Sequence, residues 1–366
     1  MAIAAKSEAE LADAVRGSNG PMRIVGGGTR SIGHVGPAEV LETSGLSGVT
    51  LYEPGALTLV SGAGTPVAEV EALLASEGQR LPFEVPDMRG LLGGTGASTL
   101  GGVVAANASG PRRVQVGACR DSLIGVRFID GTGTVIKNGG RVMKNVTGYD
   151  LVKLIAGSHG TLGVLTEVSF KLLPVPAAAM TLILNGLDDF RAVAAMSAAL
   201  ASPFEVSGAA HWPGSGTFFR IEGFAASVAY RAGQLADLLA DFGPMTREDD
   251  TANRWANIRD VSLFHGRNGD VWRVSVKPSD APVIAARSGA EAVAYDWGGG
   301  LIWMLMAPGS DLRARLGPFS GHATRVRSGP ADGIAAFQPE APALSTLTKA
   351  LRAKFDPRGI LNPGLM

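Results

Sequence analysis

Residues 143–174 read MKNVTGYDLVKLIAGSHGTLGVLTEVSFKLLP and predict a tyrosine-containing helix, a glycine turn and an alternating strand. Three glycines, Gly157, Gly160 and Gly163, lie where the chain changes direction. Without side chains, their main-chain groups can approach a flat or phosphorylated ligand closely. Because each such glycine costs roughly 0.5–1 kcal/mol, three together indicate a ligand site. A tight helix-to-strand connection with a glycine C-cap is the alternative.

The composition is that of a folded globular protein without a strong net charge. The 366 residues are 46% hydrophobic, enough for a sizeable core, and the length allows two domains. Lysine plus arginine and aspartate plus glutamate both number 33, so the net charge favours neither nucleic acid nor an anionic membrane. No apolar run approaches the roughly 18 residues of a membrane span. We therefore expect no nucleic-acid partner and no membrane span.

The first eighteen residues predict an amphipathic helix and not a targeting signal. They carry Glu8, Glu10 and Asp13, and they lack the basic start and apolar centre of a signal peptide. This pattern predicts a cytoplasmic protein, held at the periphery of the inner membrane only through partners.

Cysteine and histidine are too few and too scattered for a metal centre in this chain. Cys119 is the single cysteine, which excludes an intrachain disulfide and a cysteine-ligated iron–sulfur cluster or zinc ribbon. The five histidines show no pairing of the H-E-x-x-H kind. We predict no metal site, a small buried apolar role for Cys119, and an iron–sulfur centre only in a partner.

Hydrophobic periodicity predicts an α+β fold whose first half is rich in strands. Thr65 is placed to cap a helix that has Pro66 in its first turn. Asp130-Gly131 is expected to form a hairpin turn. The predicted strands and helices of this half are strands at 22–25, 40–42, 49–52, 57–62, 123–129 and 134–137 and helices at 7–17 and 66–77.

A segment rich in proline and alanine at 174–179 predicts a linker to a second α+β part. A βαββα order follows over 181–243, with further strands at 271–277 and 301–306. This order favours an antiparallel sheet with helices on one face. The predicted division of the chain is 1–175, 176–335 and 336–366, the last part being a helix and tail that return to the first domain.

Two more glycine-rich segments are suited to backbone binding of a ligand. RIVGGGTRSIG at 23–33 is a strand followed by exposed N–H groups, the form of an anion nest for a pyrophosphate. It only half meets the dinucleotide fingerprint, since Ser31 stands at the third glycine, and His34 and Val35 replace the last two residues of a Walker A loop. TLGGVVAANASG at 99–110 starts a helix whose N–H groups would suit a phosphate or ring carbonyl. A surface turn and an ordinary small-residue helix are the alternatives.

These segments together resemble those of flavoproteins of the vanillyl-alcohol-oxidase (PCMH) family. The likeness rests on RIVGGGTRSIG, TLGGVVAANASGPRRVQVGACRDSLIG, the 143–174 stretch and FDPRGILNPGLM, and it covers nearly the whole chain. Within that family the chain is most similar to the second FAD-binding subunits of bacterial glycolate oxidase (glycolate dehydrogenase) complexes. The resemblance implies an α+β fold: a PCMH-type FAD-binding domain of two α+β subdomains with an additional α+β antiparallel-sheet cap domain.

The resemblance also assigns residues to the cofactor. The first loop would wrap the FAD pyrophosphate, the second would contact the diphosphate and the parts near the flavin, and the third loop and the tail would complete the site. The residues so implied are Gly26, Gly27, Gly28, Thr29, Arg30, Ser31, Thr99, Gly101, Gly102, Asn107, Gly160, Thr161, Gly163, Val164 and Asn362. Relatives that attach FAD covalently use a histidine where this chain has Thr29, so non-covalent FAD is expected.

The resemblance implies oxidation of a small 2-hydroxy acid, glycolate to glyoxylate. This chemistry needs a cation for the carboxylate, a base for the hydroxyl proton and a flavin to accept the hydride. The H-x-x-D-G-N-x-H segment of catalytic relatives is absent here. The remaining candidates are Arg259, in a segment that loosely resembles W-x-x-R, and His265 and His322 as bases. An ion pair of Arg259 with Asp260 and structural roles for the histidines are the alternatives.

Two functional hypotheses follow. In the first, the chain is a redox subunit of a complex whose other chains are a catalytic flavin subunit and an iron–sulfur subunit; the single cysteine favours this. In the second, the chain is a free-standing FAD-dependent dehydrogenase or oxidase of another hydroxy acid or a sugar. A flavin-free binding protein is the third and least favoured.

Overall fold

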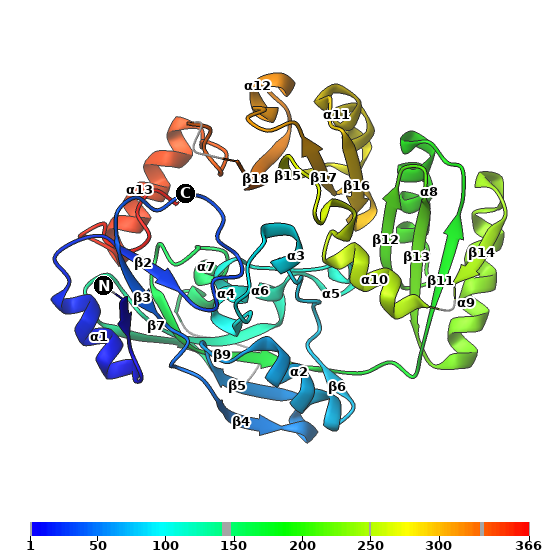
Figure 1. The fold of residues 1–366 in the computed structure, drawn as a ribbon. Helices are drawn as coiled ribbons and strands as arrows, with labels where there is room; N and C mark the ends of the chain where they lie inside the picture. The colour runs from blue at the N-terminus through cyan, green and yellow to red at the C-terminus, as the bar shows by residue number, and fades with distance from the viewer. Residues whose placement is uncertain (1, 141–147, 249, 330–332, 366) are drawn as a thin grey trace.

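The computed structural model describes residues 2–140, 148–248, 250–329 and 333–365. Residues 143–147, MKNVT, of the stretch quoted first lie outside these ranges. The molecule consists of two sheet-based halves (Figure 1). The first contains several small sheets, and the second is built on an eight-stranded antiparallel sheet. The α+β class is therefore confirmed, whereas the division at residues 175 and 335 stays a prediction.

Three small sheets make up the strands of the first half. One is parallel, in the order β1-β3-β2, one is antiparallel, in the order β4-β5-β9-β7-β8, and β10 pairs with β6. The bounds are β1 (Ala2–Ala4), β2 (Met22–Val25), β3 (Glu39–Glu42), β4 (Val49–Glu53), β5 (Thr58–Gly62), β6 (Gln79–Arg80), β7 (Leu123–Ile129), β8 (Val135–Gly139), β9 (Val164–Lys171) and β10 (Leu173–Pro174).

Strand β1 shows where local propensity fails at the start of the chain. Its three residues pair in parallel with β3, a tertiary contact that helix propensity does not report. The amphipathic helix begins only afterwards, as α1 (Glu8–Gly17), where the Ser7 hydroxyl accepts from the N–H of Glu10. The predicted helix at 7–17 is therefore confirmed to within one residue, whereas strand β1 before it was not predicted.

Short helices connect the strands of the first half. Thr65 does not cap the helix that follows it: its hydroxyl donates to Gly62 O (2.8 Å) and accepts from the N–H of Gly48 (2.8 Å). Tyr149 precedes its helix, is 88% exposed, and leaves the capping role to Asp150, so the predicted tyrosine-containing helix is wrong. The elements are α2 (Val67–Ser76), α3 (Arg89–Leu92), α4 (Leu100–Ala105), α5 (Arg113–Val116), α6 (Cys119–Ser122), α7 (Leu151–Ile155) and the 3-10 turn η1 (Pro54–Ala56).

The eight-stranded sheet of the second half runs in the order β14-β11-β13-β12-β16-β17-β15-β18. Every neighbouring pair is antiparallel, as expected. Strands β14, β16 and β18 were not predicted, because their sequences carry little hydrophobic alternation. The bounds are β11 (Ala178–Leu184), β12 (Val206–Trp212), β13 (Gly216–Gly223), β14 (Met245–Glu248), β15 (Asp270–Val276), β16 (Ala292–Asp296), β17 (Leu301–Met306) and β18 (Gly321–Arg327).

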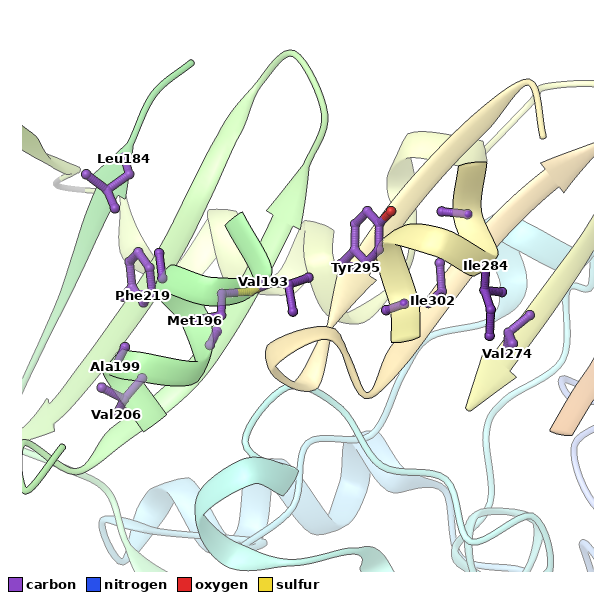
Figure 2. Close-up of a cluster of buried hydrophobic side chains, with 14 of the residues drawn as sticks. Leu184, Val193, Met196, Ala199, Val206, Phe219, Val274, Ile284, Tyr295 and Ile302 are labelled. Carbon is purple, nitrogen blue, oxygen red and sulfur yellow. The ribbon is translucent and has the colours of Figure 1, made fainter. Parts of the chain in front are cut away.

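The two faces of this sheet pack against different partners. Helices pack on one face, where Figure 2 shows Met196 of α8 and Ile284 of α11 in one buried cluster with Phe219 of the sheet. On the other face Trp303 packs in a cluster that includes Leu91 of the first half. The helices are α8 (Asp189–Ala201), α9 (Ala225–Leu238), α10 (Thr251–Arg259), α11 (Ala281–Ser288) and α12 (Leu312–Leu316), with 3-10 turns η2 (Ala240–Phe242), η3 (Ser262–Phe264), η4 (Pro278–Asp280) and η5 (Trp297–Gly299).

The chain ends back on the first half. After α13 (Pro342–Phe355), the tail runs beside β2, where the N–H of Met22 donates to Ile360 O (2.7 Å). Arg358 donates to carbonyl groups at the end of α1 and to Gly131 O (2.8 Å). In Figure 1, α1 and α13 accordingly lie at the same end of the molecule. Among the described residues, no helix is both long and apolar enough to cross a bilayer.

A buried cluster of charges holds the two halves together. Arg220 of β13 donates to the Glu84 carboxylate (2.7 Å), and Arg112 of the first half donates to Glu222 of β13 (2.8 Å). Burial alone would raise the pKa of Glu84, but Arg220 and Arg112 outweigh it, and the pKa lies below the ordinary value. Each half therefore supplies a cation and an anion to one cluster, which fixes how the eight-stranded sheet sits over the first half.

Candidate functional site

The three glycine-rich segments meet around one pocket. The first loop lines it from residue 23 to residue 35, the start of α4 contributes Thr99, and the turn before β9 contributes residues 158–160. The tail reaches the same pocket through Asn362. Segments that are far apart in the sequence are thus brought to one site, as the resemblance implies for a cofactor pocket.

The first loop presents a run of unused backbone donors. Within the described part of the chain, the N–H groups of the six residues from Gly26 to Ser31 donate to no protein acceptor, and the next one, that of Ile32, bonds Arg30 O. Unpaired N–H groups are costly unless water or a ligand accepts from them. Consecutive free donors in a loop that lines a pocket can form an anion-binding concavity. The residues present therefore fit a pyrophosphate.

Close backbone packing leaves no room for a side chain at Gly27 of this loop or at Gly96 of the segment beside it. A Cβ added to Gly27 would lie 1.4 Å from Ala97 O, and one added to Gly96 would lie 1.8 Å from Gly27 O. The loop and the 94–97 segment thus touch backbone to backbone. Glycine at these two positions is required by packing, in addition to any contact with a ligand.

Arg30 connects the first loop to neighbouring segments of the protein. Its guanidinium donates to Ser98 Oγ (2.6 Å) and to Pro86 O (2.7 Å), and burial lowers its pKa to about 10. Arg30 lines the pocket, yet its identified hydrogen bonds go to the protein. We conclude that Arg30 positions the first loop.

The start of α4 does not offer the free donors that the sequence suggested. The N–H of Leu100 donates to Thr65 O (3.0 Å) and that of Gly101 to Ala63 O (2.7 Å). The Thr99 hydroxyl accepts from the N–H of Gly102 (3.3 Å). The expectation that these N–H groups are free to bind a phosphate is therefore wrong. Thr99, Gly101 and Gly102 nevertheless line the pocket.

The turn before β9 serves both chain reversal and the pocket. Gly157 and Gly160 have positive φ angles (87° and 73°), which favour glycine, and a Cβ on Gly163 would lie 2.5 Å from the Phe128 ring. Gly157 follows the end of α7, but the C-cap residue is Ala156, and the N–H of Gly157 donates to Val104 O (3.0 Å) and not to α7, so the alternative of a glycine C-cap is wrong for that residue. Gly160 and Gly163 line the pocket, and their contact with a ligand stays a prediction.

His159 lies between these glycines and was not predicted. Its φ angle is 50°, an uncommon value for a residue with a side chain, and its ring packs edge-on against Phe337 at 4.9 Å. Burial, and after it the charge of Arg273, lowers the pKa of His159 to about 4, so the ring is neutral at pH 7. The only signal in the sequence was its place in the GSHG turn.

Asn362 ties the tail to both walls of the pocket. Its carbonyl oxygen accepts from the N–H of Ile24 (2.8 Å), and its amide donates to His159 O (2.8 Å). The residue is buried and has a φ of 43°, a conformation that asparagine tolerates better than most residues. Asn362 thus connects β2, the turn before β9 and the C-terminus.

We expect Asn362→Ala to lower the free energy of unfolding by about 2–4 kcal/mol, because it leaves a buried donor and a buried acceptor unpaired. Thermal unfolding with and without FAD measures the effect. Asn362→Asp is the matched variant, since its carboxylate can still accept from Ile24 but cannot donate to His159 O. It should fall between wild type and Asn362→Ala; equal stability of all three would contradict this role.

Three residues assigned by resemblance do not line the pocket. Asn107 accepts from the N–H of Arg120 (3.0 Å), and the Thr161 hydroxyl donates to Ser158 O (2.7 Å). Val164 is buried in the core beneath β1 and α1. These three residues therefore lie outside the lining of the pocket and contact other parts of the protein. The family motif includes these positions, but the sequence does not show which of its residues line the pocket, because the tertiary structure decides this.

A second, larger cavity of about 1440 Å³ adjoins the pocket. It shares Gly28, Ser31 and His159 with the first pocket, and β15 and β18 of the eight-stranded sheet form its far wall. Of the three predicted catalytic residues, only His322 lines it. Burial, and then Arg273 and Arg113, lowers the pKa of His322.

Arg259 and His265 lie away from both cavities. Arg259 forms a two-pronged ion pair with Asp260 (2.7 and 2.8 Å), which is the alternative that the sequence left open. His265 bonds Asp260 O through Nε2 (2.8 Å) and packs against Gly90. Their predicted catalytic roles are not supported by this placement. In the ranges that the structure covers, no three His, Cys, Asp or Glu side chains cluster closely enough to hold a metal ion.

The pocket belongs to the part of the chain that is shared with known flavoproteins. Residues 1–139 match the family model described as an FAD binding domain. Glycolate oxidase subunit GlcE of Escherichia coli (strain K12) is 35% identical over 349 residues, which are 94% of this chain and 92% of that protein. The chain belongs to the GlcE family.

Further similarities agree with this assignment. Glycolate oxidase subunit GlcD of Bacillus subtilis (strain 168) is 43% identical over 86 residues, 24% of this chain and 18% of that protein. The solved structure of alkyldihydroxyacetonephosphate synthase superposes with a TM-score of 0.69 at 17% identity, covering 99% of this chain and 76% of that one; this shows the fold alone. The PCMH-type fold and FAD as the cofactor of this oxidoreductase are thereby confirmed.

Proposed function

We propose that this GlcE-family chain is the FAD-binding subunit of a complex that oxidises glycolate to glyoxylate. The observation that carries the proposal is the run of six N–H groups from Gly26 to Ser31, which have no protein acceptor among the described residues. These residues line a pocket and lie in the part of the chain that matches the FAD binding domain. FAD supplies a two-electron acceptor for the hydride of a CH–OH donor. The protein's part is to seat the pyrophosphate, exclude water and leave an adjoining cavity for a substrate or a partner.

The proposed partners are a catalytic flavin subunit and an iron–sulfur subunit. The likeness to GlcD supports the first, since GlcE and GlcD are both named as subunits of glycolate oxidase. The second is supported by Cys119, which is the single cysteine and is fully buried. Burial raises the pKa of that thiol, which disfavours the thiolate that a cluster needs. We further propose that the chain is cytoplasmic and meets the inner membrane only through these partners.

Anaerobic stopped-flow reduction tests the division of labour. The FAD-loaded chain is mixed with glycolate or D-lactate, alone and in the presence of its partner subunits. We expect slow or no bleaching of the flavin alone and fast bleaching in the complex. Fast bleaching without partners would favour the second hypothesis, a free-standing FAD-dependent dehydrogenase or oxidase of a hydroxy acid or sugar, for which the large cavity beside the pocket is the supporting observation.

We expect the FAD to be non-covalent. Thr29 stands where covalent relatives have a histidine, and its buried side chain lines the pocket. Acid precipitation of the purified protein should therefore release the yellow flavin into the supernatant. His34 and His159 also line the pocket, so flavin that stays with the precipitate would contradict the expectation and would direct peptide mapping to these two residues.

A further inference from the structure

The cavity beside the FAD pocket contains a half-buried arginine that has no hydrogen-bond or ion-pair partner among the described residues. Arg273 of β15 lines this cavity. Among the residues that the structure describes, its guanidinium makes no hydrogen bond and no ion pair. Its cation instead lies 5.1 Å from the ring centroid of Trp297. A cation that is removed from water without an acceptor is unfavourable unless a ligand supplies one.

The other cations of this cavity are already engaged or exposed. Arg325 pairs with Asp270 (2.8 Å), Arg327 donates to several carbonyl groups, and Arg352 donates to Leu361 O (2.7 Å). Lys349 is exposed on α13. Arg273 differs from all of them because it lines the cavity from a strand of the sheet and has no protein acceptor within the ranges that the structure describes.

A second arginine lies against the same tryptophan ring, although it does not line the cavity. The guanidinium of Arg113 of α5 lies 4.4 Å from the centroid of the Trp297 ring, and it too makes no hydrogen bond or ion pair within the described ranges. Burial, followed by the charge of Arg113, lowers the pKa of Arg273 to about 10, so it stays protonated at pH 7. Asp296, the acid whose charge acts on Arg273, accepts from the N–H of Trp297 (2.7 Å) and forms no ion pair with either arginine in the described ranges.

The register of the sheet places polar side chains beside Arg273. Arg273 is directly opposite Thr324 of β18, and His322 is opposite Ser275, two residues further along β15. Directly paired residues share a face of the sheet, and diagonal neighbours lie about 7–8 Å apart. Arg273, His322 and Thr324 all line the cavity, whose opposite wall includes His159 and the first loop.

We propose that Arg273, with His322 and Thr324 beside it, binds the carboxylate of a small 2-hydroxy acid or of its 2-oxo acid product. The planar guanidinium fork matches a carboxylate in a two-pronged geometry. The site shares the wall formed by Gly28, Ser31 and His159 with the FAD pocket, so a bound acid lies next to the cofactor site. The proposal rests on the proposed function for the class of acid, and it replaces Arg259 as the carboxylate-binding residue.

Calorimetric titration of the purified, FAD-loaded full chain tests this site directly. The probes are oxalate, which has no CH–OH carbon to oxidise, and glycolamide, the neutral amide that corresponds to glycolate. We expect saturable binding of oxalate, weaker or no binding of glycolamide, and a dissociation constant for oxalate that rises about 10- to 100-fold in Arg273→Gln, the loss expected for a charge-assisted hydrogen-bonded pair. Arg273→Lys should retain part of the affinity.

Arg247→Gln is the matched control, because Arg247 is an exposed arginine on the edge strand β14. Its affinity for oxalate should equal that of wild type. The proposal is overturned if wild type does not bind oxalate, if glycolamide binds as well as oxalate, or if Arg273→Gln retains full affinity. The FAD content of each variant separates this failure from failure of the proposed function, which would appear as a wild-type chain that binds no FAD.

Discussion

Glu84→Gln is expected to lower the free energy of unfolding by about 3–5 kcal/mol, the cost of breaking a buried ion pair by removing one partner. Glu84 accepts from Arg220 through two hydrogen bonds (2.7 and 3.1 Å) and from the backbone N–H of Arg112 (2.7 Å). Without the charge of Glu84, Arg220 and Arg112 would keep only one of the two carboxylates of the pairs described above, that of Glu222. Denaturant unfolding of the FAD-free chain measures the effect.

The pH dependence gives an independent readout of the same cluster. The pKa of Glu84 is held below its ordinary value of 4.5 in the folded chain. A depressed carboxylate pKa contributes stability above the unfolded value, and this stability is lost as the pH falls through the folded value. Wild type and Glu84→Gln should therefore differ most near pH 7 and converge in acid. Curves that stay parallel down to low pH would contradict an ionised Glu84.

An exposed ion pair provides the control for this variant. Arg16 and Asp13 form a pair on α1 whose side chains are 60% and 73% exposed. Asp13→Asn should change stability by less than about 1 kcal/mol, because solvent screens such pairs. If Asp13→Asn and Glu84→Gln had equal effects, the cluster between the two halves would have no special role in holding them together.

Gly27→Ala is expected to weaken FAD binding by about 10- to 100-fold and to destabilise the chain by about 1–3 kcal/mol, the usual cost of overpacking. The new methyl group would collide with Ala97 O, a backbone atom that can yield only if the loop moves. Moving the loop displaces the N–H groups that we assign to the pyrophosphate. Fluorescence titration of the deflavinated variant with FAD measures the change in affinity.

Gly36→Ala serves as the control in the same region of sequence. A Cβ at Gly36 has no other atom within 4 Å, and its φ angle is not in the left-handed region. Gly36→Ala should bind FAD like wild type. Gly96→Ala, whose Cβ would collide with Gly27 O, should behave like Gly27→Ala. A Gly27→Ala protein with normal affinity for FAD would show that the first loop is not part of the cofactor seat.

Much of the cofactor site could be predicted because its chemistry is local. The donors from Gly26 to Ser31 belong to one continuous loop, so a glycine run after a strand was enough to indicate an anion nest. The start of α4 looked similar, but its N–H groups are taken by Thr65 O and Ala63 O. Acceptors supplied from distant segments cannot be read from the glycine pattern alone.

The proposed substrate site was harder to predict because it depends on an arginine that has no hydrogen-bond acceptor among the described residues. Arg259 sits in a motif-like segment, yet Asp260 next to it neutralises its charge. Arg273 lies in an ordinary alternating strand, and only the register of β15 with β18 reveals that it faces a cavity beside His322. Whether an arginine has a partner is decided by the tertiary structure, so the sequence alone does not show it.

The central claim is that this chain seats FAD by its pyrophosphate in the first loop, and a competition titration tests it most directly. Deflavinated wild-type chain is titrated with FAD, and the titration is repeated in the presence of ADP, which carries the pyrophosphate, and of riboflavin, which does not. We predict one FAD per chain, competition by ADP, and little competition by riboflavin. Binding of FAD that ADP leaves unaffected, or no saturable binding of FAD, would contradict the account.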